Sequence, residues 1–210
     1  MSEDAELGFT EHLFKVLVIG DHKVGKTSFV KRYVKNKYYE ELKTTIGVDF
    51  SMKVIDWDGH MRVRLQLWDI AGQERVRGLN RVCFKGSSGA LVVYDVTNGS
   101  TLDGALIWKH ELDGQVMLRN GLPVPVVLLA NKCDETKVCR RNASLLENLC
   151  QGKGFIEWFQ TSAKENINLD EAAKFLVKHI LQNNEESVKE EEQNMQINLK
   201  QQAKSKSTCC

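Results

Sequence analysis

Short apolar runs and helical periods alternate along most of the chain. Three runs have the length and the continuous apolar character of strands buried on both faces of a sheet, namely residues 13–19, 90–94 and 124–130. Helical periods are found at residues 26–34, 102–116, 143–150 and 169–182. Because strands alternate with helices, the pattern predicts an α/β fold, with a mostly parallel sheet and helices on both faces.

A second kind of pattern lies between residues 48 and 68. Residues 48–55 and 61–68 alternate apolar and polar side chains, and the turn residues Asp58 and Gly59 lie between them. This arrangement predicts a β-hairpin that adds one antiparallel edge strand to the sheet. Phe159 lies on a further short segment that indicates a last strand. The chain is therefore expected to form a six-stranded sheet.

The composition changes after Asn183. Residues 184–210 are polar, with three consecutive glutamates at 190–192 and few apolar side chains left to bury. This tail is therefore predicted to be disordered, with a frayed extension of the last helix as the alternative. Residues 1–11 are expected to form a flexible N-terminus, which leaves residues 12–183 as one folded domain.

Composition and charge argue against several classes of protein. The hydrophobic fraction of 42% suffices for a core, and the net charge of +1 argues against nucleic acid as a partner. Residues 1–10 lack the apolar segment of a secretory signal, and the apolar run at 122–130 is too short to span a bilayer. The six cysteines are irregularly spaced, which favours a reduced cytosolic chain over a disulfide framework or a zinc site.

The segment from Gly20 to Thr27 reads Gly-Asp-His-Lys-Val-Gly-Lys-Thr and fits the phosphate-loop pattern G-x-x-x-x-G-K-[ST]. It lies between a predicted strand and a predicted helix, where the backbone N–H groups of such a loop can curl around phosphates. Lys26 would then reach the β- and γ-phosphates, and the Thr27 hydroxyl would bind Mg²⁺. An ordinary glycine-containing turn is the alternative for this segment taken alone.

Three later segments add candidate groups. Asp69, at the end of the predicted hairpin, has the position of a carboxylate that holds Mg²⁺, and Gln73 lies where it can orient a water molecule. Residues 131–134 follow a predicted strand, and the Asp134 carboxylate can accept hydrogen bonds from guanine N1–H and its exocyclic amine, a donor pair that adenine lacks. Residues 161–164 form a second candidate loop for the base. Each segment alone is also explained by a turn or a helix cap.

Together these motifs resemble the Ras superfamily and, within it, the Rab family, over roughly residues 12–183 and again at the last two residues. Segments similar to Rab sequences occupy residues 46–50, 64–68 and 91–97. Ile70 and the segments 128–134 and 161–168 are similar to a subgroup that serves melanosomes and other lysosome-related organelles. The resemblance implies a P-loop NTPase G domain over residues 12–183, and a small GTPase that cycles between GTP- and GDP-bound states to regulate vesicle traffic.

The resemblance also implies roles for individual residues. Gln73 and Lys26 would be catalytic, and Mg²⁺ would be held by Thr27, Thr45 and Asp69. The residues implied to contact GTP or GDP are Lys23, Val24, Gly25, Lys26, Thr27, Ser28, Tyr38, Thr45, Gly72, Asn131, Lys132, Asp134, Ser162, Ala163 and Lys164.

The chain ends in Cys209 and Cys210, a pair that receives geranylgeranyl groups in the Rab family. One lipid chain gives only marginal membrane binding, whereas two hold stably, and the tail would act as a tether. Without the other motifs, two incidental cysteines would be the preferred explanation. The resemblance implies a location on the cytoplasmic face of intracellular membranes, at endosomes and lysosome-related organelles or on Golgi-derived vesicles, with a cytosolic pool. It implies as partners an exchange factor, a GAP, a GDP-dissociation inhibitor, a Rab escort protein and effectors.

Four positions depart from the usual Rab pattern. His22 and Lys23 stand where small residues are common, and a bulky side chain at position 22 would crowd Gln73 and the arginine that a GAP supplies. Slow hydrolysis is therefore expected, and a GTP-locked scaffold is the alternative function. Val76 and Cys83 replace aromatic residues of the second switch, so effector choice is expected to differ as well. A P-loop nucleotide kinase fits poorly, because it leaves the base motif without a role.

Overall fold

The computed structural model describes residues 10–73, 80–135 and 143–186. The other residues lie outside the described part, and some of the sequence-based expectations fall on them. These are the predictions for the first nine residues, for Val76, and for residues 187–210 of the tail with Cys209 and Cys210.

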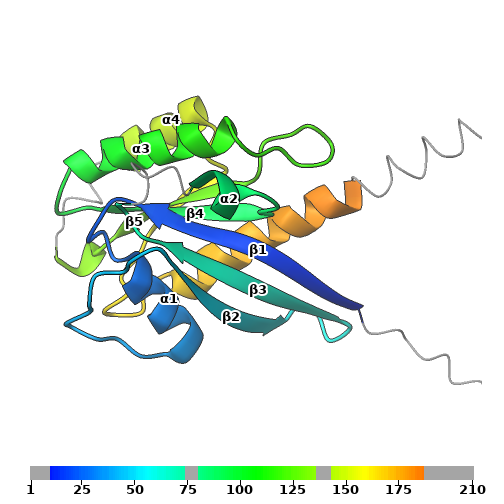
Figure 1. Cartoon of the computed structure of the whole chain (residues 1–210), viewed down its shortest axis with the longest axis horizontal. Coiled ribbons are helices and arrows are strands. Elements are labelled where there is room, and N and C mark those ends of the chain that lie inside the picture. The colour runs from blue at the N-terminus through cyan, green and yellow to red at the C-terminus, as the bar shows by residue number, and fades with distance from the viewer. Residues whose placement is uncertain (1–9, 74–79, 136–142, 187–210) are drawn as a thin grey trace, which may run out of the picture.

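Six strands form one sheet in the order β2-β3-β1-β4-β5-β6. Their bounds are Thr10–Gly20 for β1, Val48–Asp56 for β2, Met61–Ile70 for β3, Gly89–Asp95 for β4, Val126–Asn131 for β5 and Glu157–Gln160 for β6. Only the β2–β3 pair is antiparallel among these strands, and the other neighbours run parallel. The predicted sheet is therefore confirmed, including the hairpin at its edge (Figure 1).

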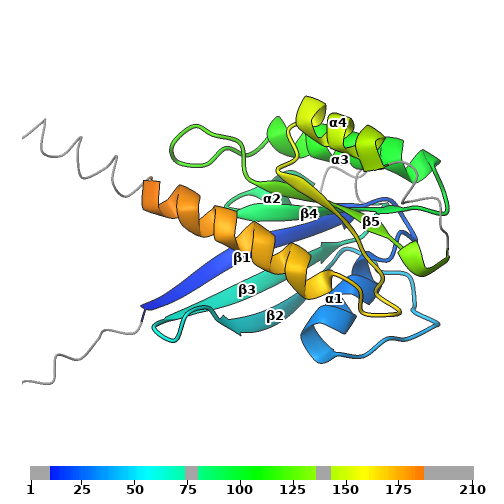
Figure 2. The ribbon, with the colours of Figure 1, turned by 180° about the vertical axis from the view of Figure 1, so that it is seen from behind.

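Helices cover both faces of this sheet, as predicted (Figures 1 and 2). One face is covered by α1, Lys26–Lys35, and by a C-terminal helix that spans residues 169–186. The other face is covered by α2, Asn80–Phe84, α3, Ser100–Asp113, and α4, Ala143–Lys153. None of the helices in the described part of the chain is long and apolar enough to cross a membrane.

The two faces bury separate hydrophobic cores, because successive residues of a strand point to opposite sides. On β1, Val16 and Val18 contribute to the core under α1 and the C-terminal helix. Leu17 and Ile19 contribute to the core under α2, α3 and α4, which also contains the fully buried Trp108. The central strands are apolar on both sides for this reason, as their continuous apolar runs indicated.

The ends of several elements differ from the predicted ones. Strand β1 begins at Thr10 instead of residue 13, because its polar first residues pair with β3 from Thr10 opposite Met61 onward. Residues 10 and 11 are thus part of the sheet and not of a flexible N-terminus. Strand β5 begins at Val126, after Pro125, which has no N–H to donate to a neighbouring strand. At the other end, residues 184–186 are helical. The boundary predicted for the disordered tail is therefore too early, and these residues extend the last helix, which was the alternative.

The exposure of two adjacent leucines on α4 leads to a stability prediction. Leu146 is 2% exposed, whereas Leu145 is 60% exposed. We expect Leu146→Ala to lower the free energy of unfolding by about 2–5 kcal/mol, because it removes buried methyl groups and leaves a cavity. The matched Leu145→Ala variant should change it by about 0.5 kcal/mol or less. Urea unfolding of both variants under identical conditions gives the two values, and equal losses would contradict this packing of α4.

The buried thiol of Cys150, also on α4, leads to a second prediction. Burial raises the pKa of this thiol to about 11, and the negative charge of Glu157 adds to the shift. At pH 8 only about one thiol in a thousand is then ionised, and the thiolate is the form that reacts. We expect iodoacetamide to label the partly exposed Cys133 much faster than Cys150, as measured by peptide mass spectrometry. In denaturant the labelling rates of Cys133 and Cys150 should converge. Equal labelling rates in the folded protein would contradict the burial of the Cys150 thiol.

Candidate functional site

The loops that carry the candidate residues gather at one edge of the sheet. Strand β1 ends at Gly20, β3 at Ile70, β4 at Asp95 and β5 at Asn131. The carboxyl ends of parallel strands lie at the same edge, and β3, although antiparallel to β2, is parallel to β1. Ligand sites in open α/β sheets form at this edge.

The phosphate loop connects β1 to α1, and Gly25 in it allows a close approach to β5. Gly25 has a φ of 99°, which side chains rarely permit, and a Cβ atom there would collide with Nδ2 of Asn131. Asn131 in turn donates a hydrogen bond of 2.8 Å from Nδ2 to the carbonyl oxygen of Val24. The loop is therefore held against the end of β5 by its backbone.

The ammonium group of Lys26 lies inside this loop. Lys26 is 6% exposed, and its Nζ donates to the carbonyl oxygens of Gly20 at 3.0 Å and Asp21 at 2.7 Å. Burial lowers the pKa of Lys26 to about 8, and the charges of Asp69 and Asp21 oppose this shift. A phosphate group in the loop would supply the negative charge that favours the ammonium form.

Three oxygen-bearing side chains meet beside Lys26. The Thr27 hydroxyl donates to Oδ2 of Asp69 at 2.5 Å and lies 2.7 Å from the Thr45 hydroxyl oxygen. Asp69 is 1% exposed, and its Oδ1 finds no hydrogen-bond partner among the described residues. Burial raises the pKa of Asp69, although the hydrogen bond from Thr27 and the charge of Lys26 work against the rise.

This oxygen cluster fits a magnesium ion. Mg²⁺ prefers oxygen ligands, and it commonly takes one carboxylate from the protein and further ligands from phosphates and water. The uncompensated Oδ1 of Asp69 is an atom that a cation would satisfy. No group of three His, Cys, Asp or Glu side chains that could hold a metal occurs in the part of the chain that the structure describes. The three predicted metal ligands, Thr27, Thr45 and Asp69, lie within hydrogen-bonding distance of one another through Thr27, and they offer two hydroxyls and one carboxylate.

A cavity of about 260 Å³ lies next to these groups. Its walls come from the phosphate loop, the segment between α1 and β2, and the loop after β3. Of the predicted nucleotide-binding residues, those that line it are Lys23, Gly25, Lys26, Thr27, Ser28, Tyr38, Thr45, Gly72 and Lys132. His22 lines it as well, so the unusual residues of the loop face the same cavity.

The base-binding residues are placed differently from this set. Asp134, Ser162, Ala163 and Lys164 are not among the described residues that line the cavity. Asp134 is exposed on a one-turn helix, Cys133–Glu135, and Ser162 is fully buried. The two base loops are nevertheless neighbours, because the Cys133 N–H donates to the Thr161 carbonyl oxygen at 3.1 Å. The structure thus brings the two base loops together, and of the predicted base-binding residues on them only Lys132 lines the cavity around Lys26.

The side chain of Asn131 connects three loops. Besides the bond to Val24, its Oδ1 accepts a hydrogen bond of 3.3 Å from the Thr161 hydroxyl. Asn131 is 2% exposed, and Val24 is fully buried. Both were predicted to contact the nucleotide, whereas in the structure they join the phosphate loop to the two base loops. A direct contact of Asn131 with the base stays a prediction.

The loop after β3 approaches the phosphate loop closely. A Cβ atom on Gly72 would collide with the backbone N of His22, so the two backbones are in contact there. Gln73 follows and is exposed. Asp21 also contacts α3, because Nε1–H of the buried Trp108 donates to its Oδ1 at 3.3 Å. The phosphate loop is therefore packed between the second switch segment and α3.

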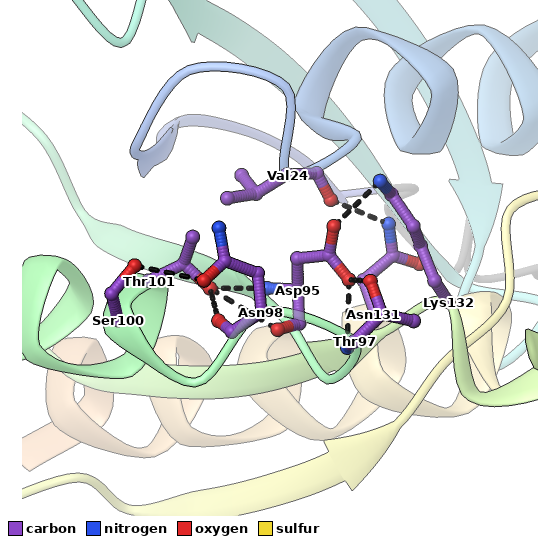
Figure 3. Close-up of polar contacts among 8 residues, drawn as sticks. All are labelled: Val24, Asp95, Thr97, Asn98, Ser100, Thr101, Asn131 and Lys132. Atoms are coloured by element: carbon purple, nitrogen blue, oxygen red, sulfur yellow. Dashed lines mark hydrogen bonds and ion pairs between the residues drawn. The ribbon is translucent and has the colours of Figure 1, made fainter. Parts of the chain in front are cut away.

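Asp95, at the end of β4, is a charged residue of the site that no sequence motif predicted. Its Oδ2 lies 2.6 Å from Nζ of Lys132, and its Oδ1 accepts hydrogen bonds from the backbone N and the hydroxyl of Thr97 (Figure 3). Burial works to raise the pKa of Asp95, but the hydrogen bonds from Lys132 and Thr97 outweigh it, so the pKa lies below its ordinary value. A carboxylate that ends an otherwise apolar strand was the signal that could have indicated it.

A partly apolar surface lies on the outer side of β2 and β3. Phe50 is 55% exposed and packs edge-on against Trp68, with ring centroids 4.5 Å apart. The ammonium of Lys15 lies 3.5 Å from the centroid of the Trp68 ring. Cys83 is 5% exposed and belongs to the core under α2, α3 and α4. Phe50 is thus exposed and Trp68 half-buried, whereas Cys83, at a position where the resemblance implied an exposed aromatic, is a buried thiol.

Comparisons with known proteins agree with this geometry. The model of the Ras family matches residues 15–182. The chain is similar to the Ras-related protein Rab-32 of Sus scrofa, with 52% identity over 95% of this chain and 89% of the relative. It is 51% identical to Rab-32A of Dictyostelium discoideum over 84% of this chain and 81% of the relative. It is 42% identical to the human Ras-related protein Rab-7L1 over 97% of this chain and all of the relative. With the phosphate loop, the hydroxyl–carboxylate cluster and two adjoining base loops at one sheet edge, these similarities show that the chain belongs to the Rab family of Ras-related GTPases.

Proposed function

We propose that this chain works as a cycling Rab GTPase that holds GTP on Lys26 and binds Mg²⁺ through Thr27, Thr45 and Asp69. As a Rab-family protein it binds guanine nucleotide, hydrolyses GTP to GDP and acts in membrane trafficking. The observation that carries the proposal is the meeting of a buried ammonium with two hydroxyls and one buried carboxylate beside a single cavity.

The proposed chemistry uses Lys26, which lines the cavity, and Gln73, which follows the lining residue Gly72 in the chain. Lys26 would hold β- and γ-phosphate oxygens, and Mg²⁺ when bound neutralises charge on the same phosphates. Gln73 would orient a water molecule that attacks the γ-phosphorus. The bond from that phosphorus to the β–γ bridging oxygen breaks, GDP keeps the oxygen, and the proton of the water passes to the released phosphate. In this account the protein contributes position and charge, and forms no covalent bond.

The same contacts would couple GTP hydrolysis to the conformation of the two switch segments. Thr45 lies in the first switch segment and Gly72 in the second, and both line the cavity. When the γ-phosphate leaves, both segments lose a contact that orders them. Phe50 and Trp68 lie on the neighbouring strands β2 and β3, so effectors reading this surface would respond to the bound nucleotide.

Selection of guanine would rest on Asp134. Its carboxylate is exposed on a short helix and can accept two hydrogen bonds from the base. Ser162, Ala163 and Lys164 lie on the adjoining loop and would complete the pocket around the base. For these loops to contact a nucleotide whose phosphates lie near Lys26, the base would sit beyond the present cavity, next to Lys132, which lines its wall.

Attachment and partners complete the proposal. We assign geranylgeranyl groups to Cys209 and Cys210, because two lipid chains give a stable membrane anchor where one does not. The partners would be an exchange factor, a GAP, effectors, a GDP-dissociation inhibitor and a Rab escort protein. Similarity to Rab-32 and Rab-7L1 leads us to propose lysosome-related organelles and endosomes as the compartment, with a cytosolic pool.

The GTP-locked scaffold is the less favoured reading. It was motivated by His22 and by the altered second switch, and neither removes a group that the reaction needs. Lys26, Thr27 and Asp69 keep their contacts with one another, and Gln73 follows Gly72 beside the phosphate loop. A slow but cycling enzyme accounts for all of these residues.

The identity of the bound nucleotide tests the proposal directly. We expect chain purified with Mg²⁺ to release GDP or GTP in near-equimolar amount on denaturation, as identified by mass spectrometry. Lys26→Ala should release far less, because the buried ammonium is the main counter-charge in the loop. Recovery of ATP, or of no nucleotide, from the unsubstituted chain would contradict the proposal.

The unusual residues of the phosphate loop lead to a kinetic prediction. We expect His22→Gly to hydrolyse bound GTP severalfold faster in single turnovers, because the backbone of His22 contacts Gly72, next to Gln73, and its side chain lines the cavity. Lys23→Gly serves as the control for loop flexibility, since Lys23 already has a φ of 64° that glycine accepts easily. Equal rates for His22→Gly and the unsubstituted chain, or the same gain in both variants, would refute crowding by His22.

A further inference from the structure

Asp95 and Lys132 lie at the ends of neighbouring strands that leave the sheet at the nucleotide edge. In the β4–β5 pairing, Asp95 is directly opposite Asn131, and Lys132 is the next residue. The Val96 N–H donates to the Asn131 carbonyl oxygen at 3.1 Å, which extends the pairing by one step. The ion pair of 2.6 Å between Asp95 and Lys132 therefore joins the loop after β4 to the loop after β5, at the point where the two strands end (Figure 3).

The carboxylate of Asp95 is fixed on its own side of this gap. Thr97 donates to Oδ1 from its backbone N at 2.9 Å and from its hydroxyl at 2.6 Å. Thr101, in the first turn of α3, accepts at 2.9 Å from the Asp95 backbone N–H. A carboxylate held by several hydrogen bonds is a preorganised acceptor, so its partner lysine loses little further order when the pair forms.

Lys132 is the more exposed member of the pair, and it lines the nucleotide cavity. The backbone of Lys132 has a φ of 63°, a left-handed conformation that residues with a Cβ adopt at some cost. Its side chain is 31% exposed, whereas that of Asp95 is 10% exposed. Lys132 thus lines the cavity while its ammonium group is paired with Asp95.

The pair also connects to the phosphate loop. Asn131, adjacent to Lys132, donates to the Val24 carbonyl oxygen at 2.8 Å. Movement of the Lys132 backbone out of its left-handed conformation would therefore act on the loop that holds the phosphates as well as on the base loop. The position of Lys132 affects both ends of a bound nucleotide.

We propose that Asp95 is a positioning residue: by pairing with Lys132 it keeps the base loop closed and slows the release of guanine nucleotide. This inference rests on the proposed function, because it concerns the same site. Asp95 itself does not touch the nucleotide; it acts through the stem and backbone of Lys132. The rate of spontaneous nucleotide exchange is thus set in part by a contact outside the phosphate and magnesium groups.

The test is the release of N-methylanthraniloyl-GDP from the full chain, chased with excess unlabelled GDP. Asp95→Asn keeps the size of the side chain but removes the charge, and we expect release to become about tenfold faster, which corresponds to about 1.4 kcal/mol. The association rate constant should change by less than about threefold, because a closed-loop contact acts mainly on dissociation. A general loss of structure would instead disturb both rate constants.

Two further variants separate positioning from general stability. Asp170→Asn breaks the exposed 2.6 Å pair with Lys174 on the C-terminal helix, away from the residues that line the cavity, and should leave release within about twofold of the unsubstituted chain. Lys132→Met should accelerate release by itself, and adding Asp95→Asn to it should give no further gain, because residues that act through one contact are not additive. Because Lys132 also lines the cavity, the comparison of the single and double variants, and not Lys132→Met alone, identifies the role of Asp95.

The outcomes are distinct. Release from Asp95→Asn at the unsubstituted rate, or effects of Asp95→Asn and Lys132→Met that multiply in the double variant, would overturn the role of Asp95 while leaving the proposed function intact. Acceleration by Asp170→Asn equal to that by Asp95→Asn would overturn it too, because the loss of any ion pair would then have the same effect. If the unsubstituted chain bound no labelled GDP, the proposed function would fail and this inference with it.

Discussion

A buried positive charge organises this end of the molecule. Lys26 is held inside the phosphate loop by two backbone carbonyl oxygens, and burial makes its charged form costly. Asp69, buried on the adjacent strand, supplies a nearby negative charge but has one oxygen without a partner among the described residues. Lys26 therefore favours a bound anion and Asp69 a bound cation, so in the proposed function phosphate and metal together would satisfy both groups.

The surrounding fold explains why such a site is tolerated. Each strand that ends at it is anchored in two separate hydrophobic cores, one under α1 and the C-terminal helix and one under α2, α3 and α4. These cores hold the strand ends rigid while polar groups collect beyond them. Asn131 then joins the loops by side-chain hydrogen bonds, so the loops form one connected unit. Stability is supplied by the layers of the fold, and chemistry by the loops at their edge.

Local patterns carried most of the information that could be predicted from the sequence. The central strands could be recognised because burial on both faces requires continuous apolar runs, and Lys26, Thr27 and Asp69 because short motifs hold them. What depends on distant pairing could not be predicted. The polar start of β1 at Thr10 is ordered only by β3, and Asp95 acquires its role only because Lys132 arrives 37 residues later in the chain. The exclusion of Asp134 from the cavity lining likewise depends on loop positions that no local motif encodes.

The contact between Trp108 and Asp21 has a consequence for how this protein can be observed. The indole ring is fully buried in the core under α3, yet its N–H donates to a side chain of the phosphate loop at 3.3 Å. An indole in that position senses the polarity and hydrogen bonding of the loop without touching solvent. Of the four tryptophans in the chain, Trp108 is therefore the one whose emission we expect to change with the state of the phosphate loop, and that change would allow nucleotide exchange to be followed without a dye.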